Sequence, residues 1–148
     1  MSETIQVVAG LCLRADEELI LLQRRGPNAF PPWSLTWCLP GGKVERGETD
    51  EQALVRELQE ELGIIEVRVA TRPGPLFEMS GVVPFSHHVR WYQFFTENDF
   101  KLVEKTRALG WFTFAEALKL PSVPGHVNGL RLIHRKLHEA QRRQEEMP

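Results

Sequence analysis

Short apolar runs separated by polar turns fill the first two thirds of the chain. Short runs rich in branched, leucine and aromatic side chains are typical of β-strands. They predict strands at 5–13, 18–22, 64–70, 75–79, 82–96 and 109–112. The polar stretch 14–17 joins the first two runs, which therefore form a hairpin or two neighbouring strands. Pro84 breaks the run at 82–96 near its start.

One helix is marked at both ends. Residues 51–62 are good helix formers, and Thr49 is placed to cap the amino end of the helix. Gln52, three residues after Thr49, completes a capping box. Gly63 stands where a left-handed residue commonly ends a helix.

Residues 26–37 form a loop rich in proline and aromatic residues. The carboxyl third of the chain is predicted to be mainly helical. Residues 114–120 predict a short helix that Pro121 ends. From about Val127 apolar residues recur every three or four positions, as in an amphipathic helix. Strands flanked by helices in mixed order predict an α/β or α+β layered fold. At 148 residues, one domain covering 1–148 is expected.

Composition excludes several classes of protein. Eighteen Lys and Arg against twenty Asp and Glu give a net charge of −2, so no general attraction to nucleic acid polymers or anionic membranes is expected. The apolar runs are too short to span a bilayer, and the amino terminus lacks the positive region of a secretory signal. Cys12 and Cys38 form neither a disulfide framework nor a metal pair by spacing, which favours a reducing, cytoplasmic location.

The predicted helix carries an acidic stripe beside its apolar seam. At about 100° per residue, Glu57, Glu60 and Glu61 share an arc of about 100°. The seam next to it consists of Leu54, Val55, Leu58 and Leu62. Like charges at this spacing repel, and no lysine lies on the stripe. A solvated face is one interpretation. The other is a site for a divalent cation such as Mg²⁺, which takes carboxylate oxygens and draws further ligands from water and substrate phosphates.

Two glycines and an arginine flank the stripe. The sequence Pro40-Gly41-Gly42 predicts a turn before the helix, where glycine lets a backbone carbonyl approach a metal or ligand closely. Arg56, one residue before the stripe, is placed to pair with Glu48 and to fix the preceding loop against the helix. The alternative is a surface ion pair of small energetic value.

These residues together resemble the signature of a known family. Gly42 is followed after five residues by Glu48, and after seven more by Arg56-Glu57-Leu58, Glu60-Glu61 and Gly63-Ile64. The pattern is similar to the Nudix box of the Nudix hydrolases at every fixed position. Members of that family cleave nucleoside diphosphates linked to another moiety X and use Mg²⁺ or Mn²⁺. The resemblance implies their fold here, an α/β/α sandwich with a mixed β-sheet between helices.

The resemblance also implies roles for residues of the box. By position, Glu57 and Glu61 resemble the principal metal ligands, with Glu60 and the carbonyl of Gly41 assisting. Glu57 is the first choice for the base that takes a proton from the attacking water. Catalytic roles are therefore expected for Glu57 and Glu60, and also for Arg56 and Glu48.

Two further expectations follow from the same resemblance. Glu48 would orient Arg56 or join the metal cluster. A further metal or base carboxylate often comes from a loop ahead of a strand that contains tryptophan. Glu104, seven residues before Trp111, is that candidate, and an exposed loop glutamate is the alternative.

Several segments are similar to the MutT-like branch of the family, whose members hydrolyse nucleoside triphosphates, oxidised ones included, to the monophosphate and pyrophosphate. These segments are 39–48, the end of the second strand at 23–25, and 121–128. By this resemblance the substrate-binding candidates are Arg24, Arg25, Gly42, Lys43 and Asn128. Asn128 would offer its amide to a base edge. Capping of the last helix is the alternative role for Asn128.

The identity of X stays open. ADP-ribose, a nucleotide sugar, a dinucleoside polyphosphate and a capped RNA end are alternatives within the family, and a non-catalytic module that senses a nucleotide is an alternative of another class. Basic residues on the last helix alternate with acidic ones, which favours a solvated face over a nucleic-acid surface. We therefore expect a nucleotide substrate, Mg²⁺ as cofactor with Mn²⁺ as substitute, and neither a membrane nor a nucleic acid polymer as partner. A homodimer is left open.

Overall fold

The computed structural model describes residues 4–14, 18–27, 34–72, 74–82, 87–98, 100, 106–122 and 124–146. Within them the strands are β1 (Ile5–Leu11), β2 (Leu13–Arg14), β3 (Leu19–Arg25), β4 (Trp37–Cys38), β5 (Gly41–Lys43), β6 (Arg68–Val69), β7 (Phe77–Val82), β8 (His87–Phe95) and β9 (Thr106–Phe112). The helices are α1 (Asp50–Leu62), α2 (Phe114–Ala117) and α3 (Pro124–Glu146). None of the helices in the described part of the chain combines the length and the apolar character that a bilayer crossing requires.

The described strands form two sheets. In the first, β1 pairs antiparallel with β5 and parallel with β8, and β7 and β6 pair antiparallel with successive parts of β8. In the second, β3 pairs antiparallel with β9 along its length and with β2 and β4 at its two ends. The parallel pair β1–β8 makes the first sheet mixed, as predicted.

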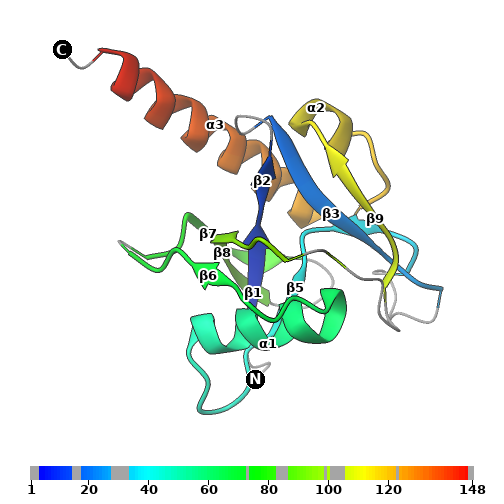
Figure 1. The fold of residues 1–148 in the computed structure, drawn as a ribbon. Helices are drawn as coiled ribbons and strands as arrows, with labels where there is room; N and C mark the ends of the chain where they lie inside the picture. Colours follow the sequence, from blue (N-terminus) through cyan, green and yellow to red (C-terminus); the bar gives the residue numbers. More distant parts are fainter. Residues whose placement is uncertain are drawn as a thin grey trace.

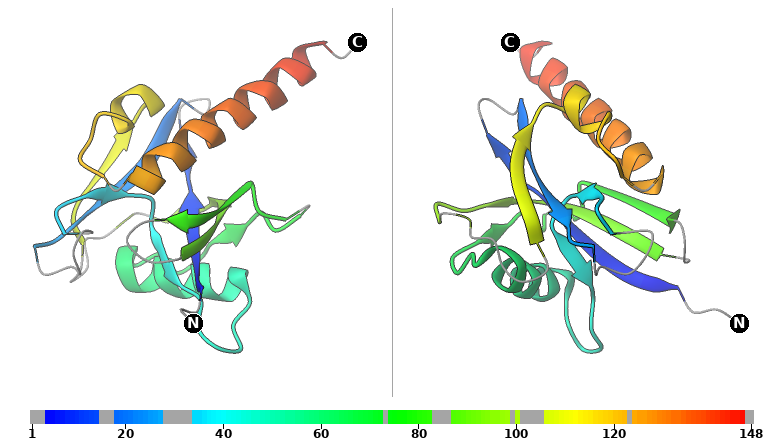
Figure 2. Two further views of the ribbon diagram at one scale, coloured as in Figure 1. Left: turned by 180° about the vertical axis from the view of Figure 1, so that it is seen from behind. Right: turned by 90° about the vertical axis from the view of Figure 1, so that its right-hand side faces the viewer.

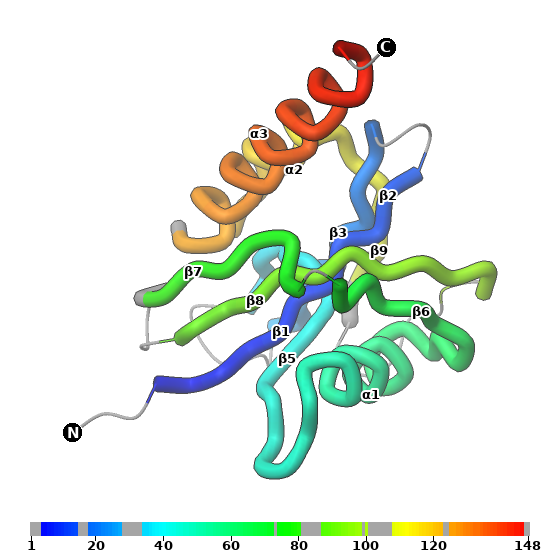
Figure 3. The backbone as a smooth tube through the Cα atoms, turned by 90° about the vertical axis from the view of Figure 1, so that its left-hand side faces the viewer, coloured from blue at the N-terminus to red at the C-terminus, as the bar shows by residue number. Residues whose placement is uncertain are grey.

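Helices cover both faces of the strands. Helix α1 lies on one side of the sheets, and α2 and α3 lie on the other (Figure 1). Figure 3 shows the strands enclosed between α1 and α3. Because successive side chains of a strand point to opposite faces, β1 contributes to two cores. Val8 belongs to the core that contains Leu54 of α1, whereas Ala9 belongs to the core that contains Ile133 of α3. The layered α/β/α fold is therefore confirmed.

Helix α1 begins and ends where the sequence predicted. The hydroxyl of Thr49 accepts a hydrogen bond from the amide of Gln52, and the Gln52 side chain accepts one from the amide of Thr49. These reciprocal bonds satisfy two amides at the amino end of the helix that have no partner within it. Gly63 ends the helix at φ 65°, in the left-handed region. The seam residues Leu54, Leu58 and Leu62 are fully buried.

The strands differ from the prediction in several places. The strand predicted at 64–70 is only β6, β9 begins before 109, and β4 includes Trp37 of the predicted loop. Two further differences concern β1 and β5. The run 5–13 divides at Cys12: β1 enters the first sheet, and only β2 forms the expected hairpin with β3. The predicted turn at Gly41 and Gly42 is wrong, because both glycines lie in β5 and pair with Ala9 and Val8 of β1. The sequence gives no sign of β5 because glycine is disfavoured in strands, and pairing with β1 overrides that preference.

The last helix starts earlier than its apolar pattern indicates. Helix α3 begins at Pro124, which suits a first helical position because proline has no amide hydrogen to satisfy. Its carboxyl half extends beyond the strands, as Figure 2 shows from two sides. The six residues of α3 after Ala140 are all exposed, which explains why the apolar recurrence stops there.

Candidate active site

The strand β5 brings the backbone of Gly41 and Gly42 against helix α1. A Cβ on Gly41 would lie 2.0 Å from the carbonyl oxygen of Val8, and Gly41 has φ 156°. A Cβ on Gly42 would lie 2.5 Å from the carboxylate of Glu57. Both glycines are therefore required by close contacts: Gly41 by the neighbouring strand, and Gly42 by a carboxylate that packs directly on the backbone.

Glu61 is the most deeply buried carboxylate of the acidic stripe, with 5% of its side chain exposed. It accepts hydrogen bonds from the side-chain amide of Gln23 at 2.8 Å and from the backbone amide of Gly41 at 3.3 Å. A guanidinium nitrogen of Arg25 lies 3.0 Å from its other oxygen. A buried carboxylate needs partners of this kind. Glu61 thus joins α1, β3 and β5 at one point.

Glu57 lies beside Glu61 on the same face of α1 and is 14% exposed. Burial raises the pKa of the Glu57 carboxyl group above its ordinary value, and the charge of Glu61 raises it further. Arg56 opposes this shift by donating a hydrogen bond of 2.9 Å to Glu57. Glu57 is therefore a carboxylate with a greater than usual affinity for a proton, as a general base requires.

Arg56 connects the loop before α1 to the acidic stripe. It donates two hydrogen bonds to Glu48, at 2.8 and 2.9 Å, in the bidentate arrangement that guanidinium and carboxylate groups favour. It also donates to the carbonyl of Lys43 at 3.0 Å and lies 3.5 Å from Glu60. The hydrogen bonds from Arg56 lower the pKa of Glu48 to about 2. The ion pair expected between Arg56 and Glu48 is therefore present.

Arginines relieve part of the repulsion on the stripe. No lysine lies on the stripe, so the sequence alone pointed to a cation as the only relief. In the structure Arg25 neutralises Glu61 from β3, and Arg56 lies against Glu57 and Glu60. Two strands, β4 and β5, separate Arg25 from α1 in the sequence, so helical geometry alone could not reveal this contact.

The two arginines expected to bind substrate point to opposite sides of β3. Arg25 follows Leu21 and Gln23 on the side of α1 and donates to the carbonyl of Gly41 at 3.3 Å. Arg24 lies on the side of Leu22, which faces α2 and α3. The structure therefore brings Arg25, but not Arg24, to the carboxylates.

The remaining candidates are more exposed or lie elsewhere. The Glu60 side chain is 60% exposed, and Lys43 is exposed on β5. Asn128 is exposed in the second turn of α3, four residues after its first residue, so the alternative that it caps this helix is wrong. Glu104 lies outside the described residues.

Two partners of the site were missed from the sequence. Gln23 is fully buried and donates a hydrogen bond to Glu61. The sequence hint was that Gln23 is a polar side chain next to the apolar run of β3, where a buried amide needs a partner. Asp50, the first residue of α1, accepts hydrogen bonds from Arg90 and from the hydroxyl of Tyr92, the latter at 2.7 Å. These two residues of β8 fix the start of α1, and only the pairing of distant segments brings them there.

The donor set suits a hard divalent cation. Glu57 is partly buried and Glu61 is buried, and their mutual repulsion contributes to the raised pKa of Glu57. An oxygen-ligated cation would remove that cost. Among the described residues no three histidine, cysteine or acidic side chains converge into a complete cage. Mg²⁺ needs no such cage, because it keeps several water ligands and takes one or two carboxylates.

Comparison with known proteins identifies the family. Residues 4–133 match the NUDIX domain family. The CTP pyrophosphohydrolase of Escherichia coli is 35% identical over 123 residues, 83% of this chain and 86% of that protein. The 8-oxo-dGTP diphosphatase of Escherichia coli is 47% identical over 60 residues, 40% of this chain and 44% of that protein. The crystal structure of a MutT NUDIX hydrolase from Burkholderia pseudomallei is 25% identical with a TM-score of 0.70, covering 88% of this chain and 98% of that chain. The chain belongs to the Nudix hydrolase family.

Proposed function

We propose that this Nudix hydrolase splits nucleoside or deoxynucleoside triphosphates, including those with oxidised bases, into the monophosphate and pyrophosphate, with Mg²⁺ as cofactor and Mn²⁺ as substitute. The observation that carries the proposal is the pair of carboxylates, partly buried Glu57 and buried Glu61, packed on the glycine backbone of β5. A pyrophosphate linkage is strongly anionic, so a site with two such carboxylates binds it only together with cations.

Glu57, Glu61, Glu60 and the carbonyl of Gly41 are the groups that would hold the metal. When bound, a divalent cation neutralises phosphate oxygens and makes water a stronger nucleophile. Glu57 would accept the proton of the water that attacks phosphorus in line. A new phosphorus–oxygen bond forms to this water as the bond to the leaving phosphate oxygen breaks.

Two arginines position the carboxylates for this step. Arg25 holds Glu61 at 3.0 Å and neutralises part of its charge. Arg56 donates to Glu57 at 2.9 Å and anchors to Glu48, so the base is held by a group that is itself fixed. Pre-set side chains of this kind lower the reorganisation that catalysis requires.

The names of the relatives support a triphosphate substrate. The Escherichia coli proteins at 35% and 47% identity are named for CTP and for 8-oxo-dGTP. Both of these compounds are triphosphates of a nucleoside or deoxynucleoside. Arg24 and Asn128 both lie on the α3 side of the sheets. We propose that they contact the nucleoside, whereas the groups on the α1 side handle the phosphates.

A panel of nucleotides tests the proposal. Purified protein is incubated with Mg²⁺ and nucleoside triphosphates, 8-oxo-dGTP, ADP-ribose, a nucleotide sugar or a dinucleoside polyphosphate, and the products are separated. We expect monophosphate and inorganic pyrophosphate from a triphosphate. Preferential release of ribose phosphate or sugar phosphate would assign a different X, and absence of product from every compound would support a nucleotide-sensing module.

A further inference from the structure

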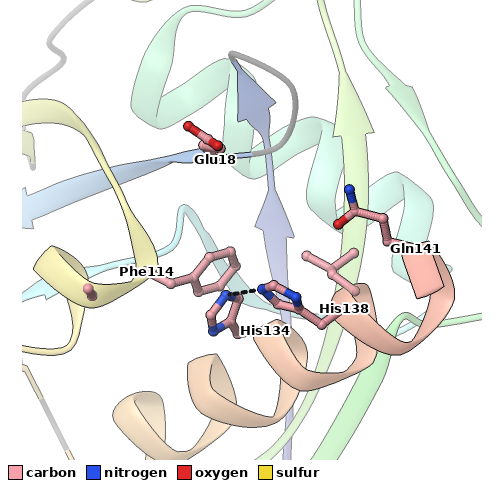
Figure 4. Close-up of a pocket in the computed structure, with 7 residues that line it drawn as sticks. Glu18, Phe114, His134, His138 and Gln141 are labelled. Carbon is pink, nitrogen blue, oxygen red and sulfur yellow. Dashed lines mark hydrogen bonds between the residues drawn. The ribbon is translucent and has the colours of Figure 1, made fainter. Parts of the chain in front are cut away.

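A pair of histidines on α3 lies apart from the carboxylate site. His134 and His138 are separated by one helical turn and therefore lie on the same face of the helix. They line a cavity of about 220 Å³ between α3, α2 and the chain just before β3. Figure 4 shows both rings directed to this space, with Phe114 behind His134 and with Glu18 and Gln141 on the walls.

The two imidazole rings are held in a defined arrangement. The His134 ring stacks on Phe114, with centroids 4.5 Å apart and planes 14° from parallel. The His138 ring stands edge-on to that of His134, at 4.5 Å and 77°. As a result the Nε2 atoms of the two histidines face each other at 2.9 Å. Without a ligand, one Nε2–H donates to the other nitrogen.

The separation of the two nitrogens matches adjacent positions around one metal ion. Metal–imidazole bonds are about 2.0–2.1 Å long. Two such bonds at a right angle place their nitrogens about 2.9 Å apart, close to the observed 2.9 Å. Right angles between ligands occur in square-planar and tetragonal complexes, which Cu²⁺ and Ni²⁺ favour with nitrogen and oxygen ligands.

We propose that His134 and His138 form a binding site for Cu²⁺ or Ni²⁺, distinct from the carboxylate site. Binding needs both imidazoles neutral, so the histidine that carries the shared hydrogen on Nε2 must change tautomer as the ion enters. Its Nε2 proton leaves to solvent and Nδ1 takes up a proton from solvent, which frees both Nε2 atoms for the ion. The described residues offer no third histidine, cysteine or acidic side chain that would complete the coordination. Water would therefore occupy the other positions, within reach of the polar walls that Glu18 and Gln141 provide.

The chemistry of the ligands separates this site from that of the catalytic cofactor. Imidazole nitrogen suits late transition metals, whereas Mg²⁺ prefers oxygen. An ion held by both histidines would also cross-link two turns of α3 beside α2. Because the histidines are correctly spaced only when the helix is formed, binding would stabilise this part of the fold.

Ni²⁺ binding to the protein tests the proposal. The protein is purified without a polyhistidine tag, and excess Mg²⁺ is present to occupy the carboxylate site. Isothermal titration is expected to show one saturable site, and Cu²⁺ should give an electron paramagnetic resonance spectrum with nitrogen coupling from two imidazoles. His138→Gln should abolish both signals. His138 is exposed, so this variant is expected to fold, which circular dichroism and thermal unfolding check.

A matched control keeps the number of histidines. In His138→Gln/Arg142→His the two imidazoles lie two turns apart, about 12 Å along the helix, too far to share one ion. This variant should also fail to bind, whereas Glu57→Gln should bind Ni²⁺ as the wild type does. Unchanged Ni²⁺ binding in His138→Gln, or no saturable binding by the wild type, would overturn the proposal.

Discussion

The carboxylate of Glu57 packs directly against the backbone of Gly42, where a side chain on residue 42 would collide with it. Glu57 is held there by Arg56 and repelled by Glu61, and burial raises its pKa. This combination makes Glu57 the residue on which the proposed chemistry depends most.

Glu57→Gln is expected to lower turnover by about 10²–10⁴-fold, because the amide cannot accept the proton of the attacking water. The folded state raises the pKa of Glu57, so ionisation of Glu57 costs stability above its unfolded pKa. The variant should therefore unfold at the same or a higher temperature than the wild type without metal. Steady-state kinetics and thermal unfolding measure the two effects. Glu51 is exposed on the same helix, so Glu51→Gln is the charge-matched control and should change neither turnover nor the unfolding temperature. Wild-type turnover in Glu57→Gln would exclude Glu57 as the base.

The adjacent glycines should respond differently to the same change. In Gly42→Ala the new methyl group meets the end of the Glu57 side chain, which can move, so activity should fall while stability changes little. In Gly41→Ala the methyl group meets the backbone of Val8, and we expect a loss of about 2–3 kcal/mol in the free energy of unfolding. Urea titration and kinetics on both variants check this. Equal losses of stability would contradict the assignment of the two contacts.

At the scale of the element, α1 presents the acidic stripe because its ends and its seam are fixed. The capping box starts it, Gly63 ends it, and the leucine seam sets its rotation about its axis. Arg90 and Tyr92 hold its first residue from β8. Loss of any of these would shift the carboxylates relative to β5.

Thr49→Ala should lower the free energy of unfolding by about 1 kcal/mol, because the amide of Gln52 loses its acceptor. Thr49→Ser keeps the hydroxyl and should restore most of the stability. Denaturation in urea, with midpoints compared at constant slope, measures the difference. A serine variant as unstable as the alanine variant would show that the methyl group, and not the cap, matters.

At the scale of the whole molecule, the site exists where a loop, a helix and two strands meet. Arg56 joins the loop before α1 to the helix, and Glu61 joins α1 to β3 and β5. Stability and metal affinity are therefore coupled, which gives two predictions for the intact protein.

Acid should weaken the link between Arg56 and Glu48. A glutamate in an unfolded chain titrates near about 4.3, and the folded state lowers the pKa of Glu48 to about 2. Because the folded value is the lower one, the stabilisation is complete above about pH 4.3 and is lost as the pH falls towards about 2. Urea unfolding of wild type and Glu48→Gln from pH 6 downwards should show a difference that closes over this range. A difference independent of pH would mean that the carboxylate charge is not responsible.

Divalent cations should stabilise the folded protein. Mg²⁺ at 100 times its dissociation constant adds about 2.7 kcal/mol if it binds only the folded state. Thermal unfolding of the wild type should therefore shift upwards with millimolar Mg²⁺ and return with a chelator. Glu57→Gln should show a smaller shift. An equal shift in both proteins would place the ion elsewhere.

The amino-acid sequence by itself determined helix α1, its caps, its buried seam and its acidic stripe, because these depend on neighbours three or four residues apart. It also determined the family, since the residues of the Nudix box are close together in the chain. Only the tertiary structure decided that Gly41 and Gly42 form a strand, and that Arg25 and Gln23 of β3 serve Glu61. The physical reason is that a buried charge takes its partners from whichever segment packs against it, and the packing of sheets and helices, not local spacing, selects that segment.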